Sequence, residues 1–310
     1  MSNGIGVLSK AAFRKWSEQS SWPNGDITFS SVSDPGTTHQ IPILEESFTP
    51  ERLWESVETL TAGAGRHEAQ IIGKRHSGHI LCQGMYNNLD RLIACVMGFE
   101  NPNDAGLNGG SPDPTGGKYV HVYELDDVLA EQDWGSSERL ASGSGGGTWT
   151  AEDDKVRFGT LAFYKQVADW IFAPVMWDKM TIEFDFERCT IRFDGGAGDY
   201  TRDSGDNWNR DNWSMQDNTK HLIMPDAEFK IGSVDGTTLS WQEMGITRFR
   251  LVLENMLTWE QDTQSGLYVK EPCRNGSRRV TGGFDLLRYQ DDDVIDQLDD
   301  NTEMKAWIKF

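Results

Sequence analysis

The sequence predicts a mainly β protein, and three observations favour that class. Apolar and polar residues alternate with a period of two in several segments, of which residues 180–193 are the clearest. Glycine occurs 32 times and marks many turns, and tryptophan occurs 12 times, which is typical of packed β surfaces. Segments with helical periodicity are few. With 310 residues, the chain has room for two domains or for one large β unit.

The strand pattern is best developed in the middle of the chain. Three apolar residues alternate there with three acidic residues, and two more apolar positions follow a turn expected at Arg188. The apolar positions are Ile182, Phe184, Phe186, Ile191 and Phe193, and the acidic ones are Glu183, Asp185 and Glu187. Residues 119–123 and 249–253 alternate in the same way. Half-buried antiparallel strands have this period.

One helix is marked at both ends. It begins after Asn87 and Asn88, which are good N-cap residues, and Gly98 stands at its C-terminal stop. Its apolar positions fall on one face: Leu89, Leu92, Ile93, Val96 and Met97. Weaker patterns predict a helix over residues 161–172, another after residues 291–293, and a short one near residues 11–16.

Polar, glycine-rich stretches divide the chain. Residues 1–36 are expected to form a flexible arm, and residues 142–147 (SGSGGG) a flexible link. Residues 106–117 are rich in turn residues, and residues 195–218 form a long stretch of Asp, Asn and Gly that we expect to be a loop. These breaks suggest two domains, residues 37–155 and 156–310, whose strands can interleave.

Charge and composition exclude several function classes. The 29 basic and 49 acidic residues give a net charge of −20, which opposes binding to nucleic acid or to an anionic membrane. No stretch is long and apolar enough for a membrane helix, and we expect no secretory signal at the start. The four cysteines form no CxxC pair, which fits reduced thiols in a cytoplasmically made protein.

Two distant segments are similar to one another. In residues 73–98 a glycine and basic residues precede an apolar run, which leads into a helix after Asn87. In residues 276–298 the same order recurs, with the helix after Asp291, offset by an insertion of about two residues. Any hairpin followed by a helix has part of this pattern, but the shared order favours a duplicated β-plus-helix domain.

In their order along the chain, four segments resemble the tail tube proteins of long-tailed bacteriophages. They are residues 68–98, 118–125, 180–193 and 272–298, which together span most of residues 40–310. The resemblance implies two tandem tail-tube-like β-sandwich or barrel domains, each with a flanking helix. It also implies trimeric, pseudo-sixfold rings that stack into a tube in the virion tail. A tape-measure protein, tail terminator and distal tail proteins would be partners, and DNA would pass through.

Under this interpretation the acidic row has a role. We expect Glu183, Asp185 and Glu187 to face the lumen, where negative charge keeps DNA phosphates from adhering. The plain alternative is a solvated sheet face. Carboxylates about 6–7 Å apart on one strand also resemble a glycosidase pair. However, 49 acidic residues produce such pairs by chance, so we expect no catalytic residues, no metal and no cofactor.

The Asp-rich stretch leaves a second function open. Its aspartates could bind calcium, although their spacing does not match an EF-hand. They are Asp199, Asp203, Asp206, Asp211 and Asp217. Trp208 and Trp213 are unusual in a solvated loop, and we interpret them as anchors to a neighbouring subunit or to their own domain. The alternatives are therefore a carbohydrate- or calcium-binding β-sandwich on a virion surface and a non-polymerising ring protein at the tail terminus.

Overall fold

The computed structural model describes residues 10–15, 40–56, 69–85, 89–101, 122–125, 159–165, 168–185, 187–203, 213, 215, 220–223, 227–235, 238–243, 245–261, 267–269, 272–286 and 304–309. Within these residues the protein is mainly β, as expected, with a single helix, α1 (Asp90–Met97). The strands of the first half are β1 (Lys10–Lys15), β2 (Ile43–Glu46), β3 (Thr49–Ser56), β4 (Ala69–Gln83), β5 (Gly98–Asn101) and β6 (Val122–Leu125). The second half contributes β7 (Gly159–Tyr164), β8 (Asp169–Phe184), β9 (Cys189–Asp203), β10 (Glu228–Asp235), β11 (Thr238–Glu243), β12 (Ile246–Glu254), β13 (Leu257–Thr258), β14 (Cys273–Arg274), β15 (Arg279–Leu286) and β16 (Met304–Lys309).

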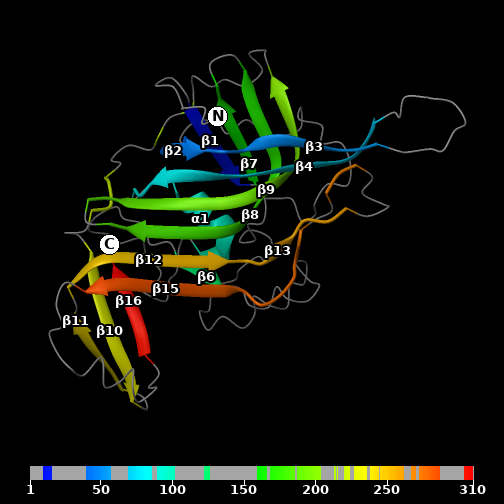
Figure 1. Cartoon of the computed structure of the whole chain (residues 1–310). Helices are drawn as coiled ribbons and strands as arrows, with labels where there is room; N and C mark the ends of the chain where they lie inside the picture. The colour runs from blue at the N-terminus through cyan, green and yellow to red at the C-terminus, as the bar shows by residue number, and fades with distance from the viewer. Residues whose placement is uncertain are drawn as a thin grey trace, which may run out of the picture.

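A long hairpin of β8 and β9 lies at the centre of the main sheet (Figure 1). Its turn is closed by two backbone hydrogen bonds between Asp185 and Arg188, which confirms the turn expected there. The two halves of β8 have different neighbours. β7 pairs with the half before Trp177, whereas β12 pairs with residues 179–184. β8 therefore belongs to two parts of the fold.

The first part is a nearly closed barrel. Its strand order is β1-β7-β8-β9-β4-β2, with every neighbour antiparallel. The circuit is completed at residues 40–41, where Gln40 forms a bridge with Ala12 and the Ile41 N–H donates to the Ala11 carbonyl at 2.9 Å. A closed barrel satisfies the backbone groups that an open sheet would leave at its edges.

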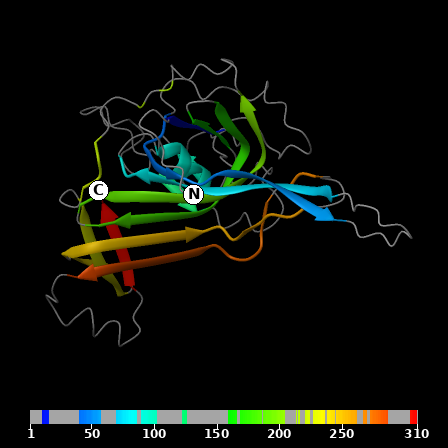
Figure 2. The same cartoon turned by 45° about the horizontal axis from the view of Figure 1, so that its top comes forward.

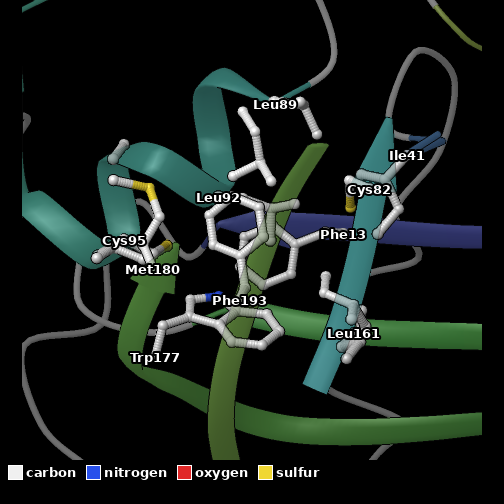
Figure 3. Packing of buried hydrophobic residues seen from close by; sticks show 14 of the residues in the cluster. Phe13, Ile41, Cys82, Leu89, Leu92, Cys95, Leu161, Trp177, Met180 and Phe193 are labelled. Atoms are coloured by element: carbon white, nitrogen blue, oxygen red, sulfur yellow. The ribbon is translucent and has the colours of Figure 1, made fainter. Parts of the chain in front are cut away.

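Aromatic rings fill the barrel. Phe48 lies with its ring centre 5.3 Å from that of Phe172 and 5.8 Å from that of Trp177, and Phe13 lies 5.9 Å from Trp177. All four side chains are at most 1% exposed. Figure 3 shows how Leu89, directly before α1, and Leu92 of α1 complete this cluster beside Phe193. The predicted apolar face of the helix is thus the face that meets the core.

The C-terminal end of α1 is fastened to distant parts of the chain. The side-chain amide of Asn255 donates to the carbonyls of Val96 and Trp177, each at 3.0 Å, and Arg278 donates to the Met97 carbonyl at 3.0 Å. The last carbonyls of a helix lack partners within it, and a cationic donor there is favoured by the helix dipole. These contacts position α1 against both parts of the sheet.

The second part extends away from the barrel as β12 and β15, which continue the sheet from β8 (Figure 2). A separate sheet of order β11-β10-β16 packs against this extension. Phe229 of β10 carries the contact, with its ring centre 6.0 Å from Phe249 and 4.9 Å from Phe284. On the other side, β3 and β4 form a hairpin that extends past the end of β9 (Figure 2).

Two helix predictions are wrong, and burial explains both. Residues 161–164 lie in β7 and residues 11–15 in β1, where they pair with one another as antiparallel strands. The apolar–polar alternation of a strand is absent there because both faces of the two strands are covered. Ala11 and Phe13 face the barrel core, whereas Ala12 and Ala162 belong to a second apolar cluster on the other face. β1 also falls inside the predicted N-terminal arm, residues 1–36. The helix predicted after residues 291–293 lies outside the described residues.

The predicted loop over residues 195–218 is wrong in its first third, since residues 195–203 complete β9. The glycines there are required by close approach, not by a turn. A Cβ added to Gly195 would lie 2.4 Å from the Met176 carbonyl oxygen, and one on Gly196 would lie 2.8 Å from the Trp259 ring. Glycine within a strand often marks such a contact.

The two predicted domains share one sheet. β1 and β4 come from the first 155 residues, and they pair directly with β7 and β9, respectively, from the remainder. Within the described residues, strands from both sides of residue 155 therefore interleave in one sheet, as the sequence analysis allowed. Both copies of the internal repeat do contain a strand, β4 in one and β15 in the other. The helix predicted after residues 291–293, which belongs to the second copy, lies outside the described residues.

We predict that Asn255→Ala lowers the free energy of unfolding by about 2 kcal/mol, because it leaves two buried carbonyls without their donor. Urea denaturation measures the effect. Asn275→Ala is the matched control, since Asn275 is exposed. Equal stability of the two variants would contradict the role given to Asn255.

Candidate functional site

The predicted acidic row lies on the face of the sheet opposite the core. Glu183 and Asp185 have side chains 53% and 64% exposed, whereas Phe184 between them is fully buried. Glu187 is exposed but stands in the hairpin turn after the end of β8. Phe186 lies outside the described residues. The alternation seen in the sequence thus corresponds to a two-sided sheet up to residue 185.

Both strand carboxylates have arginine partners on β12. The Arg250 Nε lies 3.0 Å from Glu183 Oε1, and the two residues stand opposite one another in the register of β8 and β12. Arg248 lies 4.0 Å from Asp185 and 4.0 Å from Asp285 of β15. The row predicted as a negative wall is therefore accompanied by positive charges that the strand pattern of β8 alone does not reveal.

More ion pairs continue across the same face. Lys179 contacts Glu254 at 2.7 Å, and Arg192 contacts Asp194 at 2.7 Å. The hydrogen bond from Lys179 lowers the pKa of the Glu254 carboxyl, and the hydrogen bond to Asp194 raises the pKa of Arg192. Both effects favour the charged forms. This ion-paired face, on the outward side of β8, β9, β12 and β15, is one candidate functional surface.

The edge of the sheet is a second candidate surface. Among the described strands, only β12 pairs with β15, and seven of the eight β15 residues are exposed. Val280 is 50% exposed and Phe284 is 37% exposed. Gly283 has no neighbouring heavy atom within 4 Å of where its Cβ would be. An exposed edge strand with apolar side chains is prepared for pairing with another strand.

Trp213 packs against its own chain, which is one of the two anchoring roles that the sequence left open. Its side chain is 1% exposed, and it packs on the outer side of the barrel against Ala12, Ala162 and Ala173. The small alanine side chains leave room for the indole. Trp213 therefore anchors its segment to its own chain, the alternative that the sequence left open, and cannot serve as a sugar platform. Trp208 lies outside the described residues.

A polar cluster that the sequence did not predict joins β4, β9 and residues 267–269. Lys74 contacts the Tyr268 hydroxyl at 3.0 Å and Asp199 at 3.7 Å, and His76 lies 3.8 Å from the same carboxylate. The His76 Nδ1 accepts the Glu51 N–H at 3.3 Å, so its ring proton is on Nε2, facing Asp199. The cluster lies where β9 leaves β4 and where Lys74 donates its backbone N–H to Leu267.

Asp199 has a structural environment, not that of a calcium ligand in a loop. Burial raises the pKa of its carboxyl, but the approach of His76, the Tyr200 N–H at 2.8 Å and the Lys74 charge together hold that pKa below its usual value. The carboxylate is thus ionised and already contacted by cationic or donor groups. Nowhere in the described part of the chain do three or more acidic, His or Cys side chains gather as a metal site.

One histidine contact resembles part of a catalytic triad. The Ser47 hydroxyl lies 2.7 Å from His79 Nδ1, and Glu45 lies 3.5 Å from His79 Nε2. However, the same hydroxyl accepts the backbone N–H of His79 at 2.9 Å, and the Ser47 N–H donates to the His79 carbonyl at 2.9 Å. These bonds hold the corner between β2 and β3 against β4, which is a structural role.

The cysteines are free. Cys82, Cys95 and Cys189 are buried, and Cys273 is exposed. Burial raises the pKa of the Cys189 thiol to about 12 and that of Cys82 further, so these thiols are held in their unreactive protonated form. No helix in the described residues has the length and hydropathy of a membrane span.

Comparison with known proteins places the chain in no family. No protein-family model matches it, and no curated protein matches it either.

We predict that Asp199→Asn lowers stability at neutral pH by about 2 kcal/mol, because Lys74 and His76 lose their carboxylate. The folded pKa of Asp199 lies below its unfolded value, near 3.9, so the contribution is present above that value and is lost as the pH falls through the folded pKa. The gap between wild type and variant should therefore close in acid.

Urea titrations between neutral pH and about pH 3 measure this gap. Asp285→Asn is the control, since its carboxyl is 64% exposed and its loss should change stability little. A gap of constant size across the pH range would show that the Asp199 charge is not responsible.

Proposed function

We propose that the protein is a structural subunit that polymerises through its sheet edges into stacked rings, as in the tail tube of a long-tailed phage. In this role it has no catalytic residue and needs no cofactor. It is made in the cytoplasm of a bacterial host and resides in the virion. A tape-measure protein, the tail terminator and distal tail proteins are its proposed partners besides other copies of itself, and DNA passes through the tube.

The observation that carries the proposal is the open edge at β15. Eight residues of strand present their backbone on one side without a strand partner in the described part of the chain, flanked by exposed Val280 and Phe284. Soluble proteins usually protect such an edge with charges, bulges or a covering element, because it otherwise templates association. Here the pairing itself is the proposed use of the edge.

The strand order supports repetition. From one side to the other the sheet runs β3-β4-β9-β8-β12-β15, and each neighbouring pair is antiparallel. β3 and β15 are five steps apart and so run in opposite directions. A second copy can therefore add its β3 beside β15 and continue the antiparallel pattern. Such a heterologous contact closes into rings or extends into filaments, whereas a twofold contact would stop at a dimer.

The offset between the two edges supports closure. β4 pairs with β3 over residues 69–77, beyond the point at which β9 leaves it. β15 lies toward the other end of the sheet, where β12 connects it to residues 179–184 of β8 (Figure 2). A sheet closes into a barrel only when its register is staggered from one edge to the other. The single chain has this stagger.

The finer arrangement rests on the internal repeat. Two β-plus-helix units in each subunit make three subunits sufficient for a ring with pseudo-sixfold symmetry. The strands of the two repeats, β4 and β15, stand toward opposite sides of the β9–β8 hairpin, which is compatible with two related positions in a ring. The net charge of −20 suits a conduit that must not retain DNA.

Two alternatives remain distinguishable by experiment. A ring protein of the tail terminus would form rings that do not stack. A carbohydrate- or calcium-binding module would be stabilised by its ligand, with a higher melting temperature. Two residues considered for the second alternative are already engaged within the chain, since Trp213 is buried and Asp199 is ion-paired.

We predict that the purified protein forms hollow tubes or stacked rings in negative-stain electron microscopy as its concentration rises, and that Val280→Lys prevents this. A charge at an apolar position of an edge strand blocks strand addition without burdening the monomer. Ile223→Lys is the control, since Ile223 is also exposed, at 41%, but does not lie on β15.

Both variants should retain the circular dichroism spectrum of the wild type. Tubes formed equally well by Val280→Lys would overturn the assignment of this edge. Isolated rings without stacking would favour the terminus protein instead.

A further inference from the structure

The ion-paired face is electrically balanced, although the chain is not. Five basic side chains and five carboxylates lie on its four strands or, for Asp185, directly after the end of β8. The basic ones are Lys179, Arg192, Arg248, Arg250 and Arg279, and the acidic ones are Glu183, Asp185, Asp194, Glu254 and Asp285. Their formal charges cancel, whereas the whole chain carries −20. The excess of negative charge therefore lies elsewhere, and repulsion alone does not describe this surface.

The cancellation is local and follows the strand register. Glu254 stands opposite Arg279 of β15 on one side and opposite Lys179 of β8 on the other, and Lys179 stands opposite Asp194 of β9. Opposite charges thus alternate along a row that crosses four strands. On the same two strands, β12 and β8, Arg250 stands opposite Glu183. Next to this pair, Arg248 stands between Asp185 and Asp285. Cross-strand pairs of opposite charge are favourable neighbours in a sheet.

Unpaired, the arginines of β12 would suit a polyanion. Arg250 and Arg248 are 59% and 63% exposed, and they alternate along β12 with buried Phe249, so both side chains project from one face. Guanidinium groups bind phosphate oxygens in a bidentate manner, and two of them on a flat surface can hold a DNA backbone. The Glu183 carboxylate contacts Arg250 at 3.0 Å, and the Asp185 carboxylate lies 4.0 Å from Arg248, where it offsets the positive charge.

We propose that Glu183 and Asp185 mask Arg250 and Arg248, so that double-stranded DNA can lie against this face without being held. The acidic row acts by occupying arginine donors more than by repelling phosphate at a distance. This inference rests on the proposed function, since a conduit for DNA is where such a surface is useful. It also explains why exposed arginines stand on a face that DNA must pass.

The stability of the fold does not account for the masks. Exposed ion pairs contribute little to folding, since solvent screens them and ordering two long side chains costs entropy. The core side of the same strands is formed by Phe184, Phe193 and Phe249, which the masks do not touch. Neutralising the carboxylates should therefore change DNA affinity and leave the melting temperature unchanged.

The test is the double variant Glu183→Gln, Asp185→Asn, measured with a fluorescent double-stranded oligonucleotide by anisotropy. We expect no binding by the wild type and salt-sensitive binding by the variant. Two unmasked arginines that each neutralise one phosphate should give a slope of log K against log salt of about −1.8.

Two controls separate unmasking from a change in net charge. Glu51→Gln, Glu260→Gln alters the net charge equally at exposed glutamates away from β12 and should not bind. Adding Arg248→Gln and Arg250→Gln to the double variant should abolish the new binding.

Two results would overturn the inference. One is a folded double variant that fails to bind DNA at low salt. The other is wild-type protein that already binds DNA through Arg248 and Arg250, as shown by loss of binding in Arg248→Gln, Arg250→Gln. Neither result depends on tubes, because the assay uses soluble protein, and failure to form tubes would count against the proposed function alone.

Discussion

The change of neighbours along β8 fixes how the barrel and the outer strands of the sheet are joined. The register of β8 against β9 shifts between Trp177 and Lys179, and the extra residue there is Asp178. Before the shift β8 belongs to the barrel, and after it β8 carries β12. One short segment contacts both the backbone and the side chain of Asp178. The Asn255 N–H donates to the Asp178 carbonyl at 2.6 Å, and the Leu257 N–H donates to the Asp178 carboxylate at 2.7 Å. Burial raises the pKa of this carboxyl, whereas the Leu257 hydrogen bond opposes the shift.

From this bulge the structure divides its tasks. Trp177 on one side completes the aromatic interior of the barrel, and Asn255 uses its side chain to connect the Trp177 carbonyl with the end of α1. On the other side the sheet continues outward to β15 and stops without a further partner in the described residues. A closed barrel and an open edge thus exist in one sheet. The barrel secures the fold, so that the edge is available for association.

The ion-paired face shows how a charge pattern changes meaning in three dimensions. On the sequence of β8, Glu183 and Asp185 form an acidic row. In the sheet they stand beside Arg250 and Arg248, which lie more than sixty residues further along the chain. Net charge is a property of composition and still opposes retention of DNA by the chain as a whole. The behaviour of one surface depends on which strands are neighbours, and that is decided by pairing.

The features of this protein that follow from local sequence order could be predicted without a structure. Period and capping are local properties, and they predict the mainly β class, the two-sided pattern of residues 182–185, the turn at Arg188 and the helix Asp90–Met97. Long-range packing was needed to establish that β1 and β7 are strands, since burial of both faces by the barrel core and by Trp213 removes their alternation. It also decided the close approach at Gly195, the Lys74–Asp199 cluster, the shared sheet across the expected domain boundary and the arginine partners of the acidic row. Each of these depends on contacts between residues far apart in the chain, and no local pattern specifies them.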